Sequence, residues 1–285
     1  MKPNIAILIT SHNRKKKTLG CLDALYKQSL PFDVFFVDDG STDGTREAIR
    51  KQYPQINLIQ GTGELYWNQG MRLAWETAIN RGGYDFYVWL NDDTILKENA
   101  LRILLDSFKV AQKRTKQDAI IVGSTQDILT GKLTYGGRVI YNKINFLASK
   151  LVLPGNEIKP INTFNGNIVL VPQSVVSEIG ILDKSFQHGF GDMDYGLRAN
   201  KKNIPIFIAP GFLGYCSSNT IVRDWTNPKV PFKQRYKSLN SPLGLPLKQW
   251  KIYVKRHAGI YWPIMYLKLV FRVCCPALWT LKNRK

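Results

Sequence analysis

The stretch VWLNDDTILKEN, residues 88–99, guides the interpretation of the whole chain. Its apolar run, Val88–Leu90, ends abruptly at Asn91, Asp92 and Asp93. Two adjacent carboxylates repel each other, so a folded domain gains no stability from holding them together. A cation placed between the two carboxylates and an anionic ligand would explain the pair. The run is therefore interpreted as a buried strand that ends at a binding site.

Outward from this strand, the chain alternates between strand-like and helix-like segments. The predicted strands are 5–10, 33–39, 56–60 and 84–90, and the predicted helices are 16–29, one from 43 onward, 69–81 and 97–112. This alternation indicates an α/β fold with a mostly parallel sheet and helices on both faces. Ligands of such sheets bind outside the carboxyl ends of the strands.

Polar residues gather after three of the predicted strands. TSHNRKKK (10–17) follows the first, VDDGSTDGT (37–45) ends the second and NDDT (91–94) ends the fourth. The first offers hydrogen bonds and a fixed charge, and the second can accept donors from a base and a ribose. The third can hold a divalent metal ion that bridges phosphates, and oxygen ligands favour Mg²⁺ or Mn²⁺. The candidate residues of the first two clusters are Thr10, Ser11, Asn13, Arg14, Asp38, Asp39 and Ser41.

Each cluster taken alone has a simpler interpretation. DDGST is typical of a turn with an Asp or Ser cap. NDDT could be the N-cap of the helix that follows it. The order of the clusters on alternating strands favours one shared site.

Composition sets broad limits on the protein. With 285 residues, 44% of them hydrophobic, the chain can form one large domain and an appendage. Its opening, Met1–Asn4, leads straight into a strand-like run, so no signal peptide is expected. The four cysteines show neither metal-ligand spacing nor a disulfide framework, which indicates a reduced, cytosolic chain.

The C-terminal tail differs sharply from the rest. Thirteen of the 40 Lys and Arg residues and no acidic residue follow Asp224, so the formal charge of +19 leaves +6 for residues 1–224. Basic, aromatic and apolar residues without a membrane-spanning run predict helices that lie on an anionic membrane surface, here its cytoplasmic face. The alternatives are packing on the core and a nucleic-acid patch, and no nucleic-acid partner is expected. The aromatics predicted at headgroup depth are Trp250, Tyr253, Tyr261, Trp262 and Trp279.

Several motifs resemble one family. ILITSHNRKKKTLGCLDALYKQS, VFFVDDGSTDGT and VWLNDDTIL are similar to the nucleotide-binding half of family 2 glycosyltransferases, which have the GT-A fold. The resemblance continues through FNGNIVLVPQSVVSEIGILDKSF and GDMDYGLRA and covers about residues 4–215. It implies a catalytic domain over 1–224, with a nucleotide-binding half (about 1–115) and an acceptor half (about 116–224). Residues 225–285 then form the basic helical tail.

The resemblance also implies the metal site. The family's DxD motif reads Asn91-Asp92-Asp93 here, so its first acid is replaced. Asp93 is the implied chief metal ligand, and Asp92 lies nearby at the phosphates or sugar. Some members supply a further ligand, often His, beyond the base, where this chain has Cys216. A small buried residue is the alternative for that cysteine.

A second motif implies the catalytic base. Inverting members carry an acidic motif, ED-x-D or DD-x-D. The second residue of this motif is the general base, which corresponds to Asp192 here. The first acid is replaced by Gly191. The alternative is a pair of helix-start acids, with Asp194 paired to Arg198.

The implied reaction is a single displacement that inverts the anomeric centre. It moves a sugar from a nucleotide-sugar, a UDP-sugar by preference, to a glycan or lipid-linked glycan in cell-surface polysaccharide synthesis. Trp67 and Asn68 are expected at the site mouth, and Asn165 and Asn167 at the sugar pocket. Core packing is the alternative for Trp67.

Two other functions remain open from the sequence. A nucleotidylyltransferase would need a glycine-rich loop after the first strand, which TSHNRKKK lacks. A non-catalytic nucleic-acid-binding protein would explain the charge, but would not need carboxylates at three strand ends.

Overall fold

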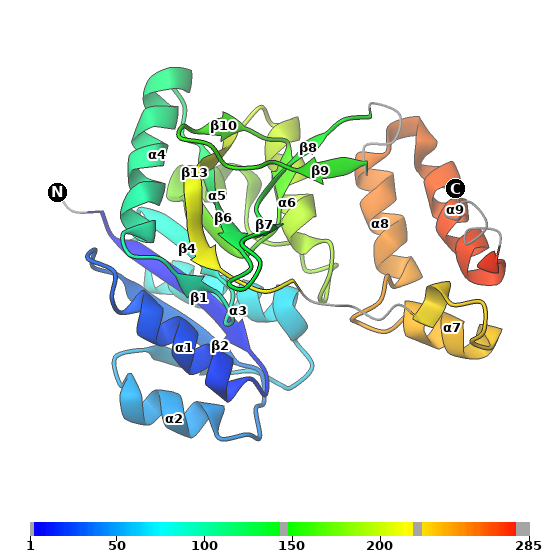
Figure 1. Ribbon diagram of the computed structural model, residues 1–285, viewed down its shortest axis with the longest axis horizontal. Helices are drawn as coiled ribbons and strands as arrows, with labels where there is room; N and C mark the ends of the chain where they lie inside the picture. Colours follow the sequence, from blue (N-terminus) through cyan, green and yellow to red (C-terminus); the bar gives the residue numbers. More distant parts are fainter. Residues whose placement is uncertain (1–2, 143–147, 219–223, 278–285) are drawn as a thin grey trace.

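A mixed sheet forms the centre of the molecule (Figure 1). The structure, a computed structural model, describes residues 3–142, 148–218 and 224–277. Along the sheet the strand order is β10-β13-β6-β12-β4-β1-β2-β3. The strands are β1 (Ile5–Ser11), β2 (Asp33–Asp38), β3 (Asn57–Gln60), β4 (Phe86–Leu90), β6 (Ile120–Gln126), β10 (Lys159–Pro160), β12 (Ile168–Pro172) and β13 (Ile206–Tyr215).

The pairing confirms the predicted α/β fold with a mostly parallel sheet. Strands β4, β1, β2 and β3 pair in parallel, and so do β6 and β13. Strand β12 runs antiparallel to both of its neighbours, β4 and β6. Two short strands, β5 (Ile95–Leu96) and β7 (Leu133–Tyr135), pair with β13 and β6. A smaller sheet holds β8 (Gly137–Ile140), β9 (Ser149–Leu151) and β11 (Thr163–Phe164).

Helices cover both faces because β1 is apolar on both. Ile5, Ile7 and Ile9 pack with α1 (Lys15–Leu25), α2 (Thr45–Gln52) and α4 (Ala100–Thr115). The alternate residues, Ala6 and Leu8, pack with α3 (Tyr66–Arg81), α5 (Gln173–Ile179) and α6 (Gly191–Lys201). Such two-sided burial is typical of strands inside a parallel sheet.

The helix predicted at 97–112 begins later, at Ala100. Ile95 and Leu96 pair with β13, and Asn99 has a left-handed φ of 63°, so helical geometry cannot start before that residue. NDDT is therefore not the N-cap of this helix, and that alternative is wrong.

The C-terminal region is helical, as predicted. It contains α7 (Phe232–Leu239), α8 (Leu247–His257) and α9 (Trp262–Cys274), with short 3-10 turns at Asp224–Thr226 and Gly259–Tyr261. These helices gather at one end of the molecule (Figure 1). None of the described helices is long and apolar enough to cross a lipid bilayer.

The membrane-facing role predicted for two tail aromatics is wrong. Trp250 is 9% exposed and Tyr253 is 2% exposed. Both pack with Phe186 and Leu197 of the sheet region in a hydrophobic core that is separate from the two cores on either face of the sheet, called here the third core. The ring of Tyr253 stacks on Phe190 at 5.0 Å. Tyr261 is exposed and Trp262 is half-buried. Trp279 lies outside the described residues.

Candidate functional site

The two adjacent carboxylates lie just beyond the carboxyl end of β4, and the guanidinium of Arg14 stands between them. Arg14 Nη1 donates to Asp92 Oδ1 at 2.8 Å, and Nη2 donates to Asp93 Oδ2. The ammonium of Lys17 lies 3.8 Å from Asp93 Oδ2. Because β1 and β4 are parallel neighbours, the loop after β1 reaches the end of β4. The paired acids thus have a cation between them, supplied by the first polar cluster.

Burial makes this pair electrostatically unusual. Asp92 is 4% exposed, and burial raises its pKa to about 6, although Arg14 opposes the shift. The hydroxyl of Thr18 donates to Asp92 Oδ2 at 3.5 Å, and it also shares a 2.9 Å hydrogen bond with Ser11. Ser11 therefore lies beside the acids, as predicted.

Cys216 lies at the same place. Its thiol donates to Asp93 Oδ1 at 3.5 Å, and Asn167 Nδ2 is 3.5 Å from the sulfur. Burial, together with the nearby Asp93 charge, raises the pKa of the Cys216 thiol to about 12. The cysteine is small and buried, but it directly contacts the acid implied as the metal ligand.

The acids alone do not form a complete metal-binding cage. Within residues 3–142, 148–218 and 224–277, no three His, Cys, Asp or Glu side chains cluster closely enough to hold an ion. Mg²⁺ usually keeps several waters and binds through one or two carboxylates plus substrate phosphates. Asp92 and Asp93 fit that pattern and would hold such an ion.

The first two polar clusters are joined by hydrogen bonds. Asn13 N donates to Ser41 Oγ at 2.9 Å, and Asn13 Oδ1 accepts from Thr42 N at 2.7 Å. His12 Nδ1 lies 2.5 Å from the carbonyl oxygen of Asp39. The structure therefore brings the loops after β1 and β2 together, as the strand order predicts.

The Asp38-Asp39 pair is buried in the wall of the site. Asp39 accepts backbone N–H bonds from Gly63, Leu65 and Tyr66 at 2.7, 2.9 and 3.0 Å. It therefore fixes the loop that starts α3. Asp38 Oδ1 accepts from the N–H of Ser41 at 3.2 Å. The DDGST pattern does not reveal this loop-holding role.

Thr10 packs against α3, and this contact requires a glycine. A Cβ added at Gly70 would lie 2.2 Å from Thr10 Oγ1. The threonine thus fixes the distance between β1 and the helix beside the site.

The first turn of α3 carries Trp67 to the end of β4. Its indole N–H donates to Asn91 Oδ1 at 2.7 Å, so the residue that replaces the first family acid orients this ring. A Cβ at Gly166 would lie 2.7 Å from the ring, so the backbone of the 165–167 segment packs directly on the indole. The N–H of Asn91 donates to the carbonyl of Asn167 at 3.1 Å. Asn165, half-buried, lies in the same segment.

Asp192 lies in the first turn of α6 and is hydrogen-bonded to this segment. Its Oδ2 accepts from Gly166 N at 3.1 Å and its Oδ1 accepts from Met193 N at 2.7 Å. Burial raises the pKa of Asp192, while these N–H donors and the nearby Arg138 lower it. A half-buried carboxylate with a raised pKa suits a proton acceptor.

In the family an acidic residue precedes the base, but this chain has Gly191 at that position. Packing explains the difference. The side chain of Asn68 is fully buried, and its Nδ2 donates to the carbonyls of Asp183 and Phe186 at 2.9 and 2.7 Å. A Cβ at position 191 would lie 1.7 Å from Asn68 Oδ1. Asn68 therefore joins α3 to the loop before α6 and leaves no space for a side chain at 191.

We expect Gly191→Ala to lower the free energy of unfolding by about 2 kcal/mol, because the new methyl group must displace Asn68. Gly189→Ala is the matched control, since a Cβ there meets nothing within 4 Å. Urea denaturation measures both. In an Asn68→Ala background the cost of Gly191→Ala should shrink. Equal stability of the two alanine variants would contradict this packing account.

Asp194 lies two residues after the candidate base and is fully buried in an ion-pair cluster. Arg198 Nε lies 2.9 Å from Asp194 Oδ2, as the alternative interpretation of this motif predicts. From α8, Arg256 Nη1 and His257 Nε2 lie 2.7 and 2.8 Å from Asp194 Oδ1. Arg256 also pairs with Asp183 at 2.7 Å. Sequence reasoning missed Arg256 and His257, because nothing near them marks a contact with residues more than 60 positions earlier.

These contacts predict a pH-dependent effect of Asp194→Asn. Burial alone would raise the pKa of Asp194, but His257, Arg198 and Arg256 hold it below its ordinary value. The stabilisation is therefore present at neutral pH and is lost as the pH falls through that lowered pKa. We expect a loss of about 3 kcal/mol at pH 7 that shrinks below about pH 4.

Urea denaturation at several pH values measures this loss. The control is Asp106→Asn, which breaks an exposed pair with Lys109 and should change stability by less than about 0.5 kcal/mol. A pH-independent loss in Asp194→Asn would contradict the ion-pair explanation.

Known proteins resemble this chain in sequence. The family model described as Glycosyl transferase family 2 matches residues 6–154, more than half of the chain. A poly-beta-1,6-N-acetyl-D-glucosamine synthase of Staphylococcus aureus is 26% identical over 159 residues, which cover 53% of this chain and 35% of that protein. The corresponding synthase of Staphylococcus epidermidis is 22% identical over 190 residues, 63% of this chain and 42% of that protein. The chain thus spans about a third to two fifths of the length of these relatives.

Solved structures share the fold. A mannosyltransferase from Pyrobaculum calidifontis, in complex with GDP-Man and Mn²⁺, has a TM-score of 0.57 at 12% identity over 100% of this chain and 77% of that chain. S. aureus TarS 1–349, in complex with UDP-GlcNAc, has a TM-score of 0.56 at 13% identity over 97% and 81%. With the family model matching more than half of its length, the chain belongs to glycosyl transferase family 2.

Proposed function

We propose that the chain is an inverting, metal-dependent glycosyltransferase. It moves a sugar from a nucleotide-sugar, a UDP-sugar by preference, to a glycan or lipid-linked glycan acceptor in cell-surface polysaccharide synthesis. Residues 1–224 are the catalytic part, which works at the cytoplasmic face of a membrane. The observation that carries the proposal is the continuous set of contacts from Arg14 through the acid pair, Asn91, Trp67 and Gly166 to Asp192.

Asp192 is the proton acceptor of the proposed reaction. An acceptor hydroxyl must lose its proton as its oxygen attacks the anomeric carbon. The carboxylate is held at the start of α6 by the N–H of Gly166, in the segment proposed to bind sugar hydroxyls through Asn165 and Asn167. The raised pKa of Asp192 increases its affinity for that proton. No covalent nucleophile is needed in a single displacement.

The opposite end of the site receives the leaving group. Arg14 and Lys17 place two cations beside Asp92 and Asp93, where the diphosphate of a donor is proposed to bind. Mn²⁺ or Mg²⁺ held by Asp93 and Asp92 would act as a Lewis acid that offsets the charge of the leaving nucleoside diphosphate. The nucleotide is proposed to bind beside Ser11, Asn13 and Ser41, in a site whose wall includes the buried acids Asp38 and Asp39.

The comparisons support the donor and acceptor classes. The neighbours with solved structures hold UDP-GlcNAc or GDP-Man, and the curated relatives are named as synthases of a polymer of N-acetyl-D-glucosamine. UDP and a cell-surface glycan are therefore the first choices to test for this chain.

Thermal unfolding with nucleoside diphosphates tests the donor site. We expect UDP with Mn²⁺ to raise the stability by about 2.7 kcal/mol when the ligand is at one hundred times its Kd, and UDP with a chelator to raise it much less. GDP and dTDP are run beside UDP to rank the nucleotides. Stabilisation by a nucleoside triphosphate and a sugar 1-phosphate, but by none of the diphosphates, would instead support a nucleotidylyltransferase.

A further inference from the structure

The outer face of α9 is an exposed apolar stripe. Ile260, just before the helix, is 84% exposed, and Ile264, Leu267 and Phe271 are 65%, 61% and 53% exposed. Their spacing of four, three and four residues places them on one side of the helix. The opposite side, with Met265, Leu269 and Val273, is buried in the third core. Helix α9 is therefore apolar on two faces, and its outer face is in contact with solvent.

Exposed lysines lie on α9 and on its neighbour α8. Lys268 is exposed and follows Ile264 by four residues, so it lies beside the stripe. Lys255 lies over the ring of Trp262 at 4.8 Å, and Lys251 lies over the ring of Tyr266 at 5.9 Å. These contacts place two exposed lysines of α8 against the side of α9 that carries Trp262 and Tyr266 and packs toward the third core. No acidic residue follows Asp224, so helices α7, α8 and α9 carry no carboxylate side chain that would repel an anionic surface.

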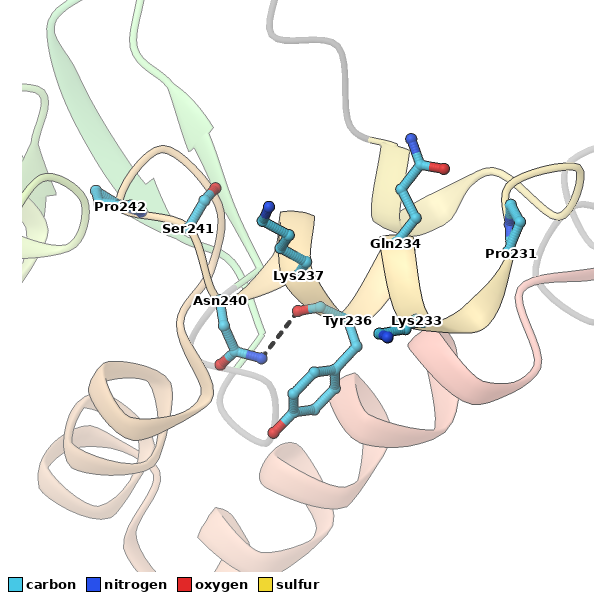
Figure 2. A pocket seen from close by; sticks show the side chains of 8 residues that line it. All are labelled: Pro231, Lys233, Gln234, Tyr236, Lys237, Asn240, Ser241 and Pro242. Carbon is cyan, nitrogen blue, oxygen red and sulfur yellow. Dashed lines mark hydrogen bonds between the residues drawn. The ribbon is translucent and has the colours of Figure 1, made fainter.

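A groove on α7 adds to the same region. It has a volume of about 930 Å³ and is lined by one side of α7 and the loop after it, including Lys233, Tyr236 and Lys237 (Figure 2). Buried Arg235 fixes α7 to the end of α9 by donating to the carbonyl of Val273 at 3.0 Å. The groove therefore lies on the helix that packs against the C-terminal end of α9. Lysines beside an exposed aromatic ring suit an anionic headgroup.

We infer that the outer stripe of α9 and the groove of α7 form one docking face for an anionic lipid surface. Apolar side chains enter the boundary of the acyl chains, while lysines on the flanks contact headgroup phosphates. This inference rests on the proposed function only for the presence of a lipid-linked acceptor, and it replaces Trp250 and Tyr253 with α9 as the lipid-contacting element. The rings of Trp250 and Tyr253 instead pack on Phe190 and so attach α8 to the loop that precedes Asp192.

Vesicle flotation of the full chain tests the docking face. The vesicles are phosphatidylcholine alone and phosphatidylcholine mixed with phosphatidylglycerol, each at low and high salt. We expect salt-sensitive binding to the anionic vesicles only. The double variant Ile264→Ser with Leu267→Ser should bind at least about tenfold more weakly. Its matched control is Leu129→Ser, because Leu129 is 91% exposed but lies in the sheet region.

A second pair of variants tests the charges without touching packed residues. Lys233→Gln with Lys237→Gln changes two exposed side chains of α7 and should weaken anionic binding by about tenfold or more. The control is Lys113→Gln with Arg114→Gln, two exposed cations of α4. Unchanged binding by both docking-face variants would overturn the inference.

Two other outcomes would also overturn it. One is binding to RNA that competes with vesicles and is insensitive to the α9 variant, which would make the region a polyanion site. The other is self-association through α9 without vesicle binding, seen by light scattering. Hydrolysis of UDP-sugars, measured in the same samples without vesicles, reports on the proposed catalytic function separately and should be unchanged in the docking-face variants.

Discussion

Asp93→Ala is expected to reduce sugar transfer by roughly 10³-fold, to near the detection limit. A metal that stabilises a leaving diphosphate supplies several kcal/mol of transition-state stabilisation, and each 1.36 kcal/mol is a factor of ten in rate. The fold should survive, because Arg14 keeps its 2.8 Å contact with Asp92. Initial rates with Mn²⁺, together with a thermal unfolding scan, measure the two effects.

Loss of nucleotide binding should accompany this loss of rate. In Asp93→Ala, Mn²⁺ should no longer strengthen the stabilisation by UDP, whereas Asp106→Ala, on the exposed side of α4, should behave as the natural chain does. If Asp93→Ala retains full activity in the presence of a chelator, the acid pair is not a metal site.

Asp192→Asn is expected to lower kcat by roughly 10²-fold or more, with little change in donor binding. The amide has nearly the same shape but cannot accept the proton of the attacking hydroxyl. Because Asp194 is ion-paired with Arg198 and Arg256 and hydrogen-bonded to His257, Asp194→Asn should mainly reduce stability. Turnover per folded molecule compares the two variants. If Asp194→Asn loses turnover and Asp192→Asn keeps it, Asp192 is not the base.

The pH profile gives an independent check of the base. Burial raises the pKa of Asp192, so the acid limb of kcat/KM should lie above the ordinary pKa of an aspartate. Activity falls as the pH drops through that limb, because the protonated carboxyl cannot accept another proton. The limb should be absent from the residual activity of Asp192→Asn.

Local periodicity and turn chemistry were sufficient to predict the N-terminal half of the fold. The strands β1 to β4 alternate with helices, and parallel pairing then brings the loops after β1, β2 and β4 to one edge. That is why Arg14 could be expected near Asp92 and Asp93. The antiparallel insertion of β12 could not be predicted in this way, because an apolar run does not reveal the direction of its neighbours.

Contacts between distant segments account for what the sequence did not reveal. Gly191 looked like a lost acid, but its small size is required by Asn68, more than 120 positions earlier. Trp250 and Tyr253 lie in a segment with the composition of a membrane-surface helix, yet their rings are buried against Phe186 and Phe190. Composition alone cannot distinguish an aromatic ring that meets lipid from one that meets a protein core.

The measurement that tests the central claim most directly is the release of nucleoside diphosphate from a panel of nucleotide-sugars. Purified chain is incubated with Mn²⁺, with each donor, and with and without glycan acceptors, and the products are resolved by chromatography. We predict that at least one donor, a UDP-sugar first among them, yields its nucleoside diphosphate, that an acceptor speeds this release, and that Asp93→Ala and Asp192→Asn suppress it. Release of no nucleoside diphosphate from any donor, or release that is equal in both variants, would contradict the account.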